Sequence, residues 1–433
     1  MRVIVCGAGI AGLALAGRLG ALGHEVTLLE RAPGPRRQGY LMDFFGPGYD
    51  AAEATGVLAA IRERGHAVTE VSYLDPAGRR RAGLPFARFA ESRRGRLVSI
   101  LRPDLEAALR EHLPAAVDLR HGVEPVAVEE GADRVRVTLA GGSDLDADLL
   151  VGADGIHSAV RRLVFGPERR YLRPLGFHTA AWTFVDPQVH AELRGRFCLT
   201  DTIDRQVGLY GLPGDRVAAF TVHRTADPAL PVDPRAAVRE RYRDLGWVVP
   251  RVLDRCPPGP QVYYDQVAQI VVPRWSGRRV TLLGDAGYAV SLLAGQGASM
   301  AVAGAYVLAD RLDRVGPVGG VGAALAGYEA LWRPVVTDVQ RTARRGTRWF
   351  LPGSRTDLRI RRAALRLAGL PGVDRVVVGA VAGPSSGLVR ELAGASGRGR
   401  PRPGHRAGST RCPRSGALDE EVGWRRTSST WCG

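Results

Sequence analysis

The chain begins with an apolar segment, a glycine-spaced turn and a second apolar segment, and this unit restricts the fold more than any other feature. Within VIVCGAGIAGLALAGRLGALGHEVTLLER, Gly7, Gly9 and Gly12 follow the GxGxxG spacing. Residues 2–6 and 25–29 are short apolar runs typical of strands, and residues 11–22 have apolar residues at helical spacing. The sequence therefore predicts a strand–helix–strand unit at the start of the chain.

Each residue type in this unit suits a dinucleotide site. Gly7 permits the tight turn, Gly9 lets the backbone approach a pyrophosphate, and Gly12 lets the helix pack close to the strand. The N-terminus of the helix offers free N–H groups and a positive dipole end. Glu30 ends the second strand, where its carboxylate can accept hydrogen bonds from a ribose. The predicted site also includes Ile10, Ala11 and Arg31. The motif alone does not distinguish NAD from FAD.

Three later stretches combine a strand end with a polar residue and a helix start. LVSILRPDLEAALREHL places Arg102 where a strand gives way to a helix, from which a guanidinium can reach a phosphate or a ribose. A solvated arginine at a helix start is the alternative. DLLVGADGIHSAVRRLVFG closes a strand on Asp154 and Gly155. VTLLGDAGYAVSLLAGQGAS closes a strand on Gly284 and Asp285. Gly295, Gln296 and Gly297 then precede a helix that begins near Ala298.

This combination resembles the FAD-dependent aromatic hydroxylases of the para-hydroxybenzoate hydroxylase type, over residues 1 to about 345. The resemblance implies that the N-terminal glycines and Glu30 bind the ADP half of FAD. It also implies that Asp154 lies near the pyrophosphate and the nicotinamide donor, and that Asp285 holds the ribityl chain. The N–H groups of residues 295–297 and the following helix would face the pyrimidine edge of the isoalloxazine.

A narrower resemblance lies in RRQGYLMDFFGPGYDAAEATGVL, which looks like the branch of tetracycline-inactivating monooxygenases and actinobacterial tailoring oxygenases. By that resemblance Asp43 and Arg102 contact the flavin, and Asp285 contacts the ribityl chain. Arg36 would contact NADPH, and Arg37 is the alternative for that role. Without the resemblance, Asp43 could be a turn former, and Arg36 and Arg37 could be solvated loop charges.

The sequence departs from the family pattern GDAAH, Pro, GQG, Asn at three positions. Tyr288 replaces the histidine, Leu292 the proline and Ser299 the asparagine. The glycines, the aspartate and the glutamine of the pattern are retained, so flavin binding is expected to be retained. The shape of the loop beside the flavin C4a position, where oxygen is activated, stays open.

The expected fold class is α/β: a Rossmann-like FAD-binding domain interleaved with a mostly antiparallel substrate domain, followed by helices. Residues 171–275 are rich in strand patterns such as TAAWTFV, RQVGLYGLP and RVAAFTVHR. We expect a discontinuous FAD-binding domain (1–170 and 276–345), a substrate domain (171–275), C-terminal helices (346–394) and a disordered tail (395–433). Residues 341–366 form an arginine-rich helical stretch whose charges we expect to be solvated.

The resemblance implies an enzyme, a monooxygenase that uses FAD, NADPH or NADH, and O2. It would form a flavin C4a-hydroperoxide and oxygenate an aromatic or polycyclic small molecule, in secondary metabolism or antibiotic modification. The alternatives are an FAD-dependent oxidase or reductase without oxygen insertion, and a flavin-binding scaffold without catalysis. Four aromatic residues of the central strands are candidate cavity walls, although core packing explains any one of them at least as well: Trp182, Phe184, Tyr210 and Phe220. His178 or His223 could act as a base, although a lone histidine on a strand is more often structural.

Composition bears on the partners, metal sites and cellular compartment that the protein can have. The net charge is +16, but the 60 basic residues are all arginine and the tail lacks interleaved aromatic residues, so we expect no nucleic-acid partner. Five scattered cysteines without a CxxC pair argue against a disulfide framework or a metal site and favour the cytoplasm. No apolar run is long enough for stable membrane insertion. The protein is expected to be a monomer or a homodimer.

Overall fold

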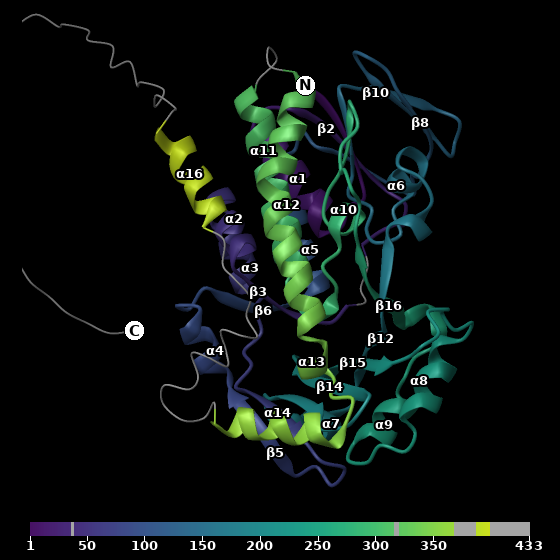
Figure 1. The fold of residues 1–433 in the computed structure, drawn as a ribbon, viewed down its shortest axis with the longest axis vertical. Coiled ribbons are helices and arrows are strands. Elements are labelled where there is room, and N and C mark those ends of the chain that lie inside the picture. Colours follow the sequence, from purple (N-terminus) through teal and green to yellow (C-terminus); the bar gives the residue numbers. More distant parts are fainter. Residues whose placement is uncertain (36–38, 316–319, 368–386, 399–433) are drawn as a thin grey trace, which may run out of the picture.

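The N-terminal part of the fold is centred on a sheet of five parallel strands in the order β17-β11-β1-β2-β7. The computed structural model describes residues 1–35, 39–315, 320–367 and 387–398 (Figure 1). The five strands are β1 (Arg2–Cys6), β2 (Glu25–Glu30), β7 (Asp118–His121), β11 (Leu149–Gly152) and β17 (Val280–Leu282). β1, α1 (Ile10–Ala21) and β2 form the predicted strand–helix–strand unit, with β1 and β2 parallel. β11 and β17 return from far along the chain to the other edge of β1.

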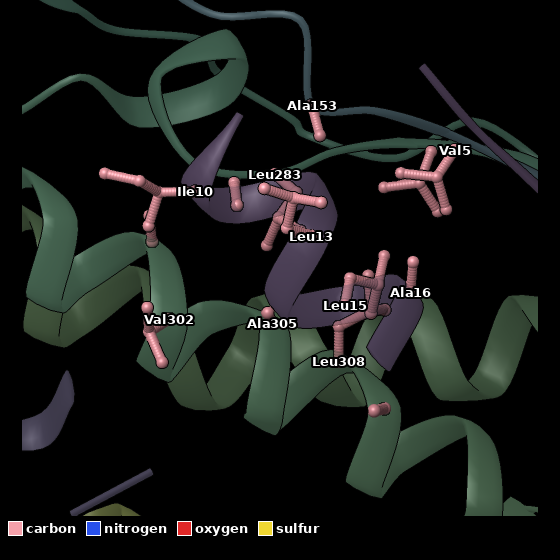
Figure 2. Packing of buried hydrophobic residues seen from close by; sticks show 14 of the residues in the cluster. Val5, Ile10, Leu13, Leu15, Ala16, Ala153, Leu283, Val302, Ala305 and Leu308 are labelled. Atoms are coloured by element: carbon pink, nitrogen blue, oxygen red, sulfur yellow. The ribbon is translucent and has the colours of Figure 1, made fainter. Parts of the chain in front are cut away.

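Helix α1 is held against the sheet by α11 (Gly297–Val315). Leu13, Leu15 and Ala16 of α1 are fully buried, and Figure 2 shows Leu15 beside Leu308 of α11. Burying a leucine side chain stabilises a fold by roughly 1.5–3 kcal/mol. The long helix α12 (Val321–Arg345) lies beside α11 (Figure 1). The motif helix α1 and the helix after the GQG segment therefore belong to one core.

The second large sheet has seven strands in the order β16-β12-β15-β14-β13-β4-β5. Five strands come from the predicted substrate domain: β12 (Leu172–Val185), β13 (Phe197–Thr200), β14 (Arg205–Leu212), β15 (Arg216–Arg224) and β16 (Tyr263–Ile270). The other two, β4 (Glu70–Leu74) and β5 (Arg80–Pro85), lie within the range that the sequence analysis assigns to the FAD-binding domain. All neighbours are antiparallel except β13 and β4. The sheet thus extends beyond residues 171–275, and the domain bounds remain our proposal.

The two faces of this sheet meet different partners. Trp182 and Phe184 point to the outer face, where they pack with α7 (Pro187–Leu193), α8 (Pro234–Tyr242) and α9 (Val249–Asp254). Tyr210 and Phe220 are in separate clusters on the inner face. The prediction that all four line one cavity is therefore wrong for Trp182 and Phe184, because a strand buried on both sides gives no sequence signal for which face meets the site.

Smaller elements connect the two parts. A three-stranded antiparallel sheet consists of β8 (Pro125–Glu130), β9 (Val135–Leu139) and β10 (Asp144–Ala147), and a two-stranded ladder of β3 (Leu41–Phe45) and β6 (Leu97–Leu101). The remaining short helices before the C-terminal region are α2 (Pro47–Thr55), α3 (Leu58–Glu63), α4 (Phe86–Ser92), α5 (Arg102–Glu111), α6 (Ala159–Val164), η1 (Glu168–Arg170), η2 (Gly259–Gln261), α10 (Asp285–Tyr288) and η3 (Leu292–Ala294).

Among the described residues, three further helices follow α12: α13 (Thr347–Phe350), α14 (Arg355–Leu367) and α16 (Leu388–Arg398). On α14, Arg361 is fully buried, pairs with Asp201 at 2.9 Å and lies 4.4 Å from the ring centroid of Tyr73. The expectation that the charges of residues 341–366 are all solvated is therefore wrong for Arg361, because it has a buried carboxylate partner. α16 contacts α2 and α11 and continues past residue 395, whereas residues 399–433 of the expected tail lie outside the described residues. In the part of the chain that the structure describes, no helix is long and apolar enough to cross a membrane.

Candidate functional site

The turn between β1 and α1 uses its three glycines in two ways. A Cβ atom on Gly7, whose φ is +104°, would lie 2.5 Å from the Ala153 carbonyl oxygen, and one on Gly12 would lie 1.8 Å from the Gly7 oxygen. Both positions exclude a side chain because of the protein's own backbone. At Gly9 no protein atom comes closer than 3.9 Å to such a Cβ, so this glycine leaves room for a ligand in front of the helix N-terminus.

A groove opens in front of this turn and gathers most of the predicted nucleotide-binding residues. Glu30 lies on its wall and its two carboxylate oxygens accept hydrogen bonds from the Ala8 N–H at 2.9 Å and the Ala32 N–H at 2.8 Å. Each oxygen keeps a second lone pair for a ribose hydroxyl. The lining includes Gly7, Ala8, Gly9, Glu30, Arg31, Arg102, Glu106, Asp154, Gly155 and His157. Ile10, Ala11 and Gly12 lie behind the groove as buried residues of α1.

The Asp154–Gly155 segment is the far wall of the groove. Asp154 accepts hydrogen bonds from the Ser158 hydroxyl and from the Val160 N–H at 3.0 Å, so its carboxylate organises the start of α6. Burial raises the pKa of Asp154, and the Ser158 hydrogen bond opposes this. Gly155 has a φ of +83°, which favours glycine, and it lines the groove. The segment therefore presents its backbone to the groove.

Asp285 faces space inside the protein. It is exposed, although its neighbours Gly284 and Ala286 are buried. Burial nevertheless raises the pKa of Asp285, while Arg102 opposes the rise and Asp265 adds to it. The Asp285 carboxylate thus reaches solvent in a region that surrounding protein partly encloses, which we call the interior space. The two charges that act on it belong to Arg102, at the start of α5, and Asp265, on β16.

Arg102 and two tyrosines share that space. Arg102 pairs with Glu106 at 3.2 Å. Burial alone would lower the pKa of Arg102, but Glu106, Tyr40 and Tyr263 together raise it. The Tyr40 and Tyr263 rings are 6.2 Å apart, and burial raises the pKa of both hydroxyls, so both stay protonated. The arginine predicted from sequence thus lies beside two aromatic residues that the sequence analysis did not identify.

Asp43 lies on β3, where the Ser99 hydroxyl of β6 donates a hydrogen bond to its carboxylate at 2.6 Å. Burial raises the pKa of Asp43, and this hydrogen bond opposes the rise. Farther along, the Phe45 N–H donates to the Ser299 hydroxyl at 3.3 Å, and a Cβ on Gly48 would lie 2.4 Å from the Ser299 Cα. The segment that contains Asp43 is therefore packed against the start of α11.

The glycines of residues 284–297 bring the late segment back to the early one. A Cβ on Gly284 would lie 2.8 Å from the Ala11 Cβ, so this glycine permits contact with α1. Gly295 is exposed with a φ of +61°, Gln296 is buried, and Gly297 and Ala298 begin α11. Segments some 280 residues apart in the chain thus meet beside the same groove and interior space.

Two of the departures from the family pattern have a structural account. The Tyr288 ring is buried 4.6 Å from the Trp275 ring, and the Tyr328 hydroxyl donates to the Tyr288 hydroxyl at 3.1 Å, so Tyr288 is a core residue. Ser299 joins α11 to β3 through its hydroxyl. Both replacements therefore lie in the core that supports the loop.

The candidate bases lie away from the site. His178 and His223 are buried on the outer face of the seven-stranded sheet, beside the Tyr264 and Tyr242 hydroxyls at 3.2 and 3.1 Å. Burial lowers the pKa of both, that of His223 to about 3. The interpretation of these histidines as structural is therefore the one that fits the geometry. Arg36 and Arg37 lie outside the described residues.

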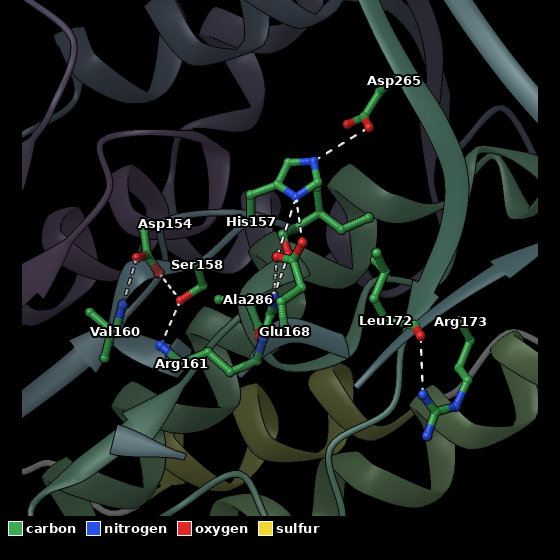
Figure 3. Close-up of polar contacts among 11 residues, drawn as sticks. Asp154, His157, Ser158, Val160, Arg161, Glu168, Leu172, Arg173, Asp265 and Ala286 are labelled. Carbon is green, nitrogen blue, oxygen red and sulfur yellow. Dashed lines mark hydrogen bonds and ion pairs between the residues drawn. The ribbon is translucent and has the colours of Figure 1, made fainter. Parts of the chain in front are cut away.

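A polar cluster beside the Asp154 segment was not identified from sequence. Figure 3 shows the His157 ring between two carboxylates, with Nδ1 3.1 Å from Glu168 Oε1 and Nε2 3.4 Å from Asp265 Oδ1. The fully buried Arg161 also pairs with Glu168, at 2.9 Å. Asp265 is 7% exposed and lies two residues after Tyr263 on the same, inner face of β16. In the sequence, this cluster is visible only as a single carboxylate, Asp265, within an expected strand. Its partner His157 lies 108 residues earlier, so no local pattern connects the two.

Comparisons with known proteins agree with this geometry. Residues 1–196 match the FAD binding domain family. An uncharacterized protein of Mycobacterium tuberculosis (strain ATCC 25618 / H37Rv) is 35% identical over 326 residues, covering 72% of this chain and 85% of that protein. A flavin-dependent monooxygenase of an unknown prokaryotic organism is 31% identical over 353 residues, covering 77% and 86%. The crystal structure of the tetracycline destructase Tet(55) superimposes with a TM-score of 0.73 at 26% identity and covers 89% of this chain and 98% of its own.

Proposed function

The chain belongs to the flavin-dependent monooxygenases and binds FAD, and from this premise we propose that it oxygenates an apolar aromatic or polycyclic small molecule with NADPH or NADH and O2. Hydroxylation is the expected outcome, in secondary metabolism or antibiotic modification. The observation that carries the proposal is the exposed Asp285 carboxylate, whose pKa responds both to Arg102 of the nucleotide groove and to Asp265 of the inner sheet face.

The residues fit FAD. Gly9 leaves room for the pyrophosphate in front of α1, and Glu30 presents free lone pairs to the adenosine ribose. Arg102 lies at the inner end of the groove and faces Asp285, so it can bind a phosphate or a ring carbonyl while Asp285 accepts from ribityl hydroxyls. Asp43 would contact the ring from β3. The proposed FAD contacts are Gly7, Gly9, Ile10, Ala11, Gly12, Glu30, Arg31, Asp43, Arg102, Asp154, Gly284, Asp285, Gly295, Gln296, Gly297 and Ala298.

The substrate would lie on the inner face of the seven-stranded sheet. An apolar cluster there has seven buried members: Phe177, Ala181, Leu199, Phe220, Val222, Val267 and Leu351. The residues that pack against it include Tyr40, Tyr73, Phe197, Tyr263 and Leu292. The Tyr40 and Tyr263 hydroxyls, protonated at neutral pH, can donate hydrogen bonds to an oxygen of the substrate. An apolar ligand with few oxygen atoms matches this combination of surfaces.

The bound FAD supplies the redox chemistry, taking electrons from the nicotinamide and activating O2. The chain's own residues hold the ring by its ribityl and phosphate groups, fix the substrate against the sheet and exclude bulk water with the apolar cluster. The N–H groups at the start of α11 and the positive end of that 19-residue helix would stabilise negative charge on a bound flavin.

Arg36 is proposed to bind the nicotinamide donor, with Arg37 as the alternative. Substituting each arginine by alanine should raise the KM for NADPH more than it alters FAD content. If neither does, the donor binds elsewhere. We further propose a cytoplasmic monomer or homodimer with no nucleic-acid partner. The described cysteines Cys6, Cys198 and Cys256 are free and buried, which is consistent with a reducing compartment.

The test is NADPH consumption by the FAD-loaded protein in the presence of a panel of aromatic polyketides, with mass spectrometry of the products. A substrate should raise the rate of NADPH oxidation and yield a product heavier by one oxygen atom. NADPH oxidation with only hydrogen peroxide or a dehydrogenated product would indicate the oxidase or reductase alternative. An FAD-loaded protein that never oxidises NADPH would indicate a scaffold.

A further inference from the structure

Both ring nitrogens of His157 face a carboxylate. Nδ1 lies 3.1 and 3.3 Å from the two Glu168 oxygens, and Nε2 lies 3.4 Å from Asp265 Oδ1 (Figure 3). A neutral imidazole has one N–H, so one carboxylate would face a lone pair. With both carboxylates ionised, the arrangement is satisfied only when both nitrogens carry protons and donate. The two contacts therefore suit an imidazolium, which can donate to both carboxylates.

The electrostatics of the cluster agree with the geometry. The hydrogen bond and charge of Asp265, helped by Glu168 and opposed by burial, raise the pKa of His157 to about 9. The groups that face the cluster come from α6, β16, α10 and the loop before β3. Arg161 of α6 pairs with Glu168, and Tyr40, Tyr263 and Asp285 surround Asp265. At neutral pH His157 therefore carries a proton on Nε2 that it can donate to the buried Asp265 carboxylate.

The two ends of the pair lie in different surroundings. The His157 side chain is 46% exposed and lines the nucleotide groove, where it can exchange protons with water. Asp265 is 7% exposed and shares the inner face of β16 with Tyr263 and Val267, which belong to the proposed substrate surface. A proton that passes from His157 to Asp265 therefore moves from the solvent-accessible groove to the buried interior space.

The proposed reaction needs such a proton. Oxygenation of a substrate RH consumes NADPH, O2 and one proton and yields ROH, NADP+ and water. Without substrate, the reduced flavin FADH− reacts with O2 and one proton to give FAD and hydrogen peroxide. In both cases one proton must enter a site that is otherwise shielded from water.

We propose that His157 and Asp265 form the proton entry path of this enzyme. His157 gives its Nε2 proton to Asp265, Asp265 passes it to the O2-derived oxygen that ends as water or hydrogen peroxide, and water in the groove reprotonates the ring, whose orientation Glu168 fixes. One proton moves in each step and no electrons move. His157 acts through Asp265 and is thus a positioning and proton-supplying residue. The inference rests on the proposed function.

The test follows proton uptake directly and needs no substrate. The FAD-loaded protein is reduced anaerobically with one equivalent of dithionite and mixed with O2 in weakly buffered solution. Flavin absorbance reports reoxidation and phenol red reports proton uptake. In the wild type we expect the two signals to change together, with a rate constant that is constant below pH 8 and falls as the pH rises through about 9.

Three variants make the test specific. His157→Gln should slow reoxidation at pH 8 by at least about tenfold, remove the fall above pH 8, and regain most of its rate with added imidazole. Asp265→Asn should be slowed similarly but not rescued by imidazole. His190→Gln is the matched control, because His190 is also partly exposed and lies 3.7 Å from a carboxylate, that of Asp215, away from the site. It should behave like the wild type.

A second readout does not depend on turnover. Proton NMR of the holoprotein should give His157 a pKa near 9, and Asp265→Asn should lower it. Reoxidation in His157→Gln within twofold of the wild type at every pH would overturn the inference, as would a slowed variant whose pH profile is unchanged and which imidazole does not rescue. A protein that takes up no FAD would instead overturn the proposed function, and the inference with it.

Discussion

Replacing Asp285 should weaken FAD binding without destabilising the protein. Within the part of the chain that the structure describes, no hydrogen bond or ion pair engages the Asp285 carboxylate, which faces interior space. A hydrogen bond to a charged group contributes about 1.5–3 kcal/mol. If Asp285 accepts one such bond from a ribityl hydroxyl, Asp285→Ala should raise the Kd for FAD by about 10- to 150-fold. The free energy of unfolding of the apoprotein should change by less than about 0.5 kcal/mol.

The assay is quenching of FAD fluorescence during titration of apoprotein, together with urea unfolding of the apoprotein. Asp285→Asn keeps an acceptor oxygen and should lose less affinity than Asp285→Ala. Asp338→Ala removes an exposed carboxylate on α12 and should leave the Kd unchanged. The reasoning is refuted if Asp285→Ala binds FAD as tightly as the wild type, or if the apoprotein loses more than about 1 kcal/mol of stability. The second result would mean that the carboxylate supports the fold rather than the ligand.

Three further predictions concern stability and can be checked by urea unfolding. Gly12→Ala puts a Cβ 1.8 Å from the Gly7 oxygen and should lower the free energy of unfolding by about 1–3 kcal/mol. Gly17→Ala on the same helix has its nearest contact at 3.7 Å and should be neutral or stabilising. Equal effects of the two substitutions would contradict the packing. Asp201→Asn leaves buried Arg361 without its anion and should lower the free energy of unfolding by about 3–5 kcal/mol. Asp204→Asn, in an exposed pair, should lower it by less than about 1 kcal/mol. A loss below about 1 kcal/mol for Asp201→Asn would contradict a buried ion pair. The pKa of His157, raised from 6.5 to about 9 in the fold, contributes stability that is complete below pH 6.5 and is lost as the pH rises to about 9, by at most about 1 kcal/mol because the ring is half exposed. His157→Gln should flatten that slope, and an unchanged slope would show that another group titrates.

The nucleotide half of the site could be predicted from sequence because its signals are local. Gly7, Gly9, Gly12 and Glu30 belong to one strand–helix–strand unit, so their spacing carries the geometry. Gly284 could be recognised only by resemblance, since its contact with Ala11 spans more than 270 residues. The structure explains why glycine occupies position 284: both its positive φ and its close approach to Ala11 disfavour a side chain.

The inner wall could not be predicted in the same way. Trp182 and Phe184 alternate on β12 just as wall residues would, but α7, α8 and α9 cover their face. His157 and Asp265 are 108 residues apart and meet only because β16 pairs with β12 beside the Asp154 segment. The strands β4 and β5 likewise join the sheet through a parallel pairing with β13 some 120 residues later. Period and spacing describe one element at a time, whereas these contacts depend on the tertiary arrangement.

The central claim is that remote segments around Gly9, Asp43, Arg102 and Asp285 surround one FAD molecule between the two large sheets. A crystal structure of the protein with bound FAD tests it most directly. We predict the pyrophosphate in front of Gly9, a ribityl hydroxyl within hydrogen-bond distance of Asp285, and the ring beside Arg102 and the inner face that carries Tyr263. A flavin found in any other groove, or crystals that take up no FAD at saturating concentration, would contradict the account.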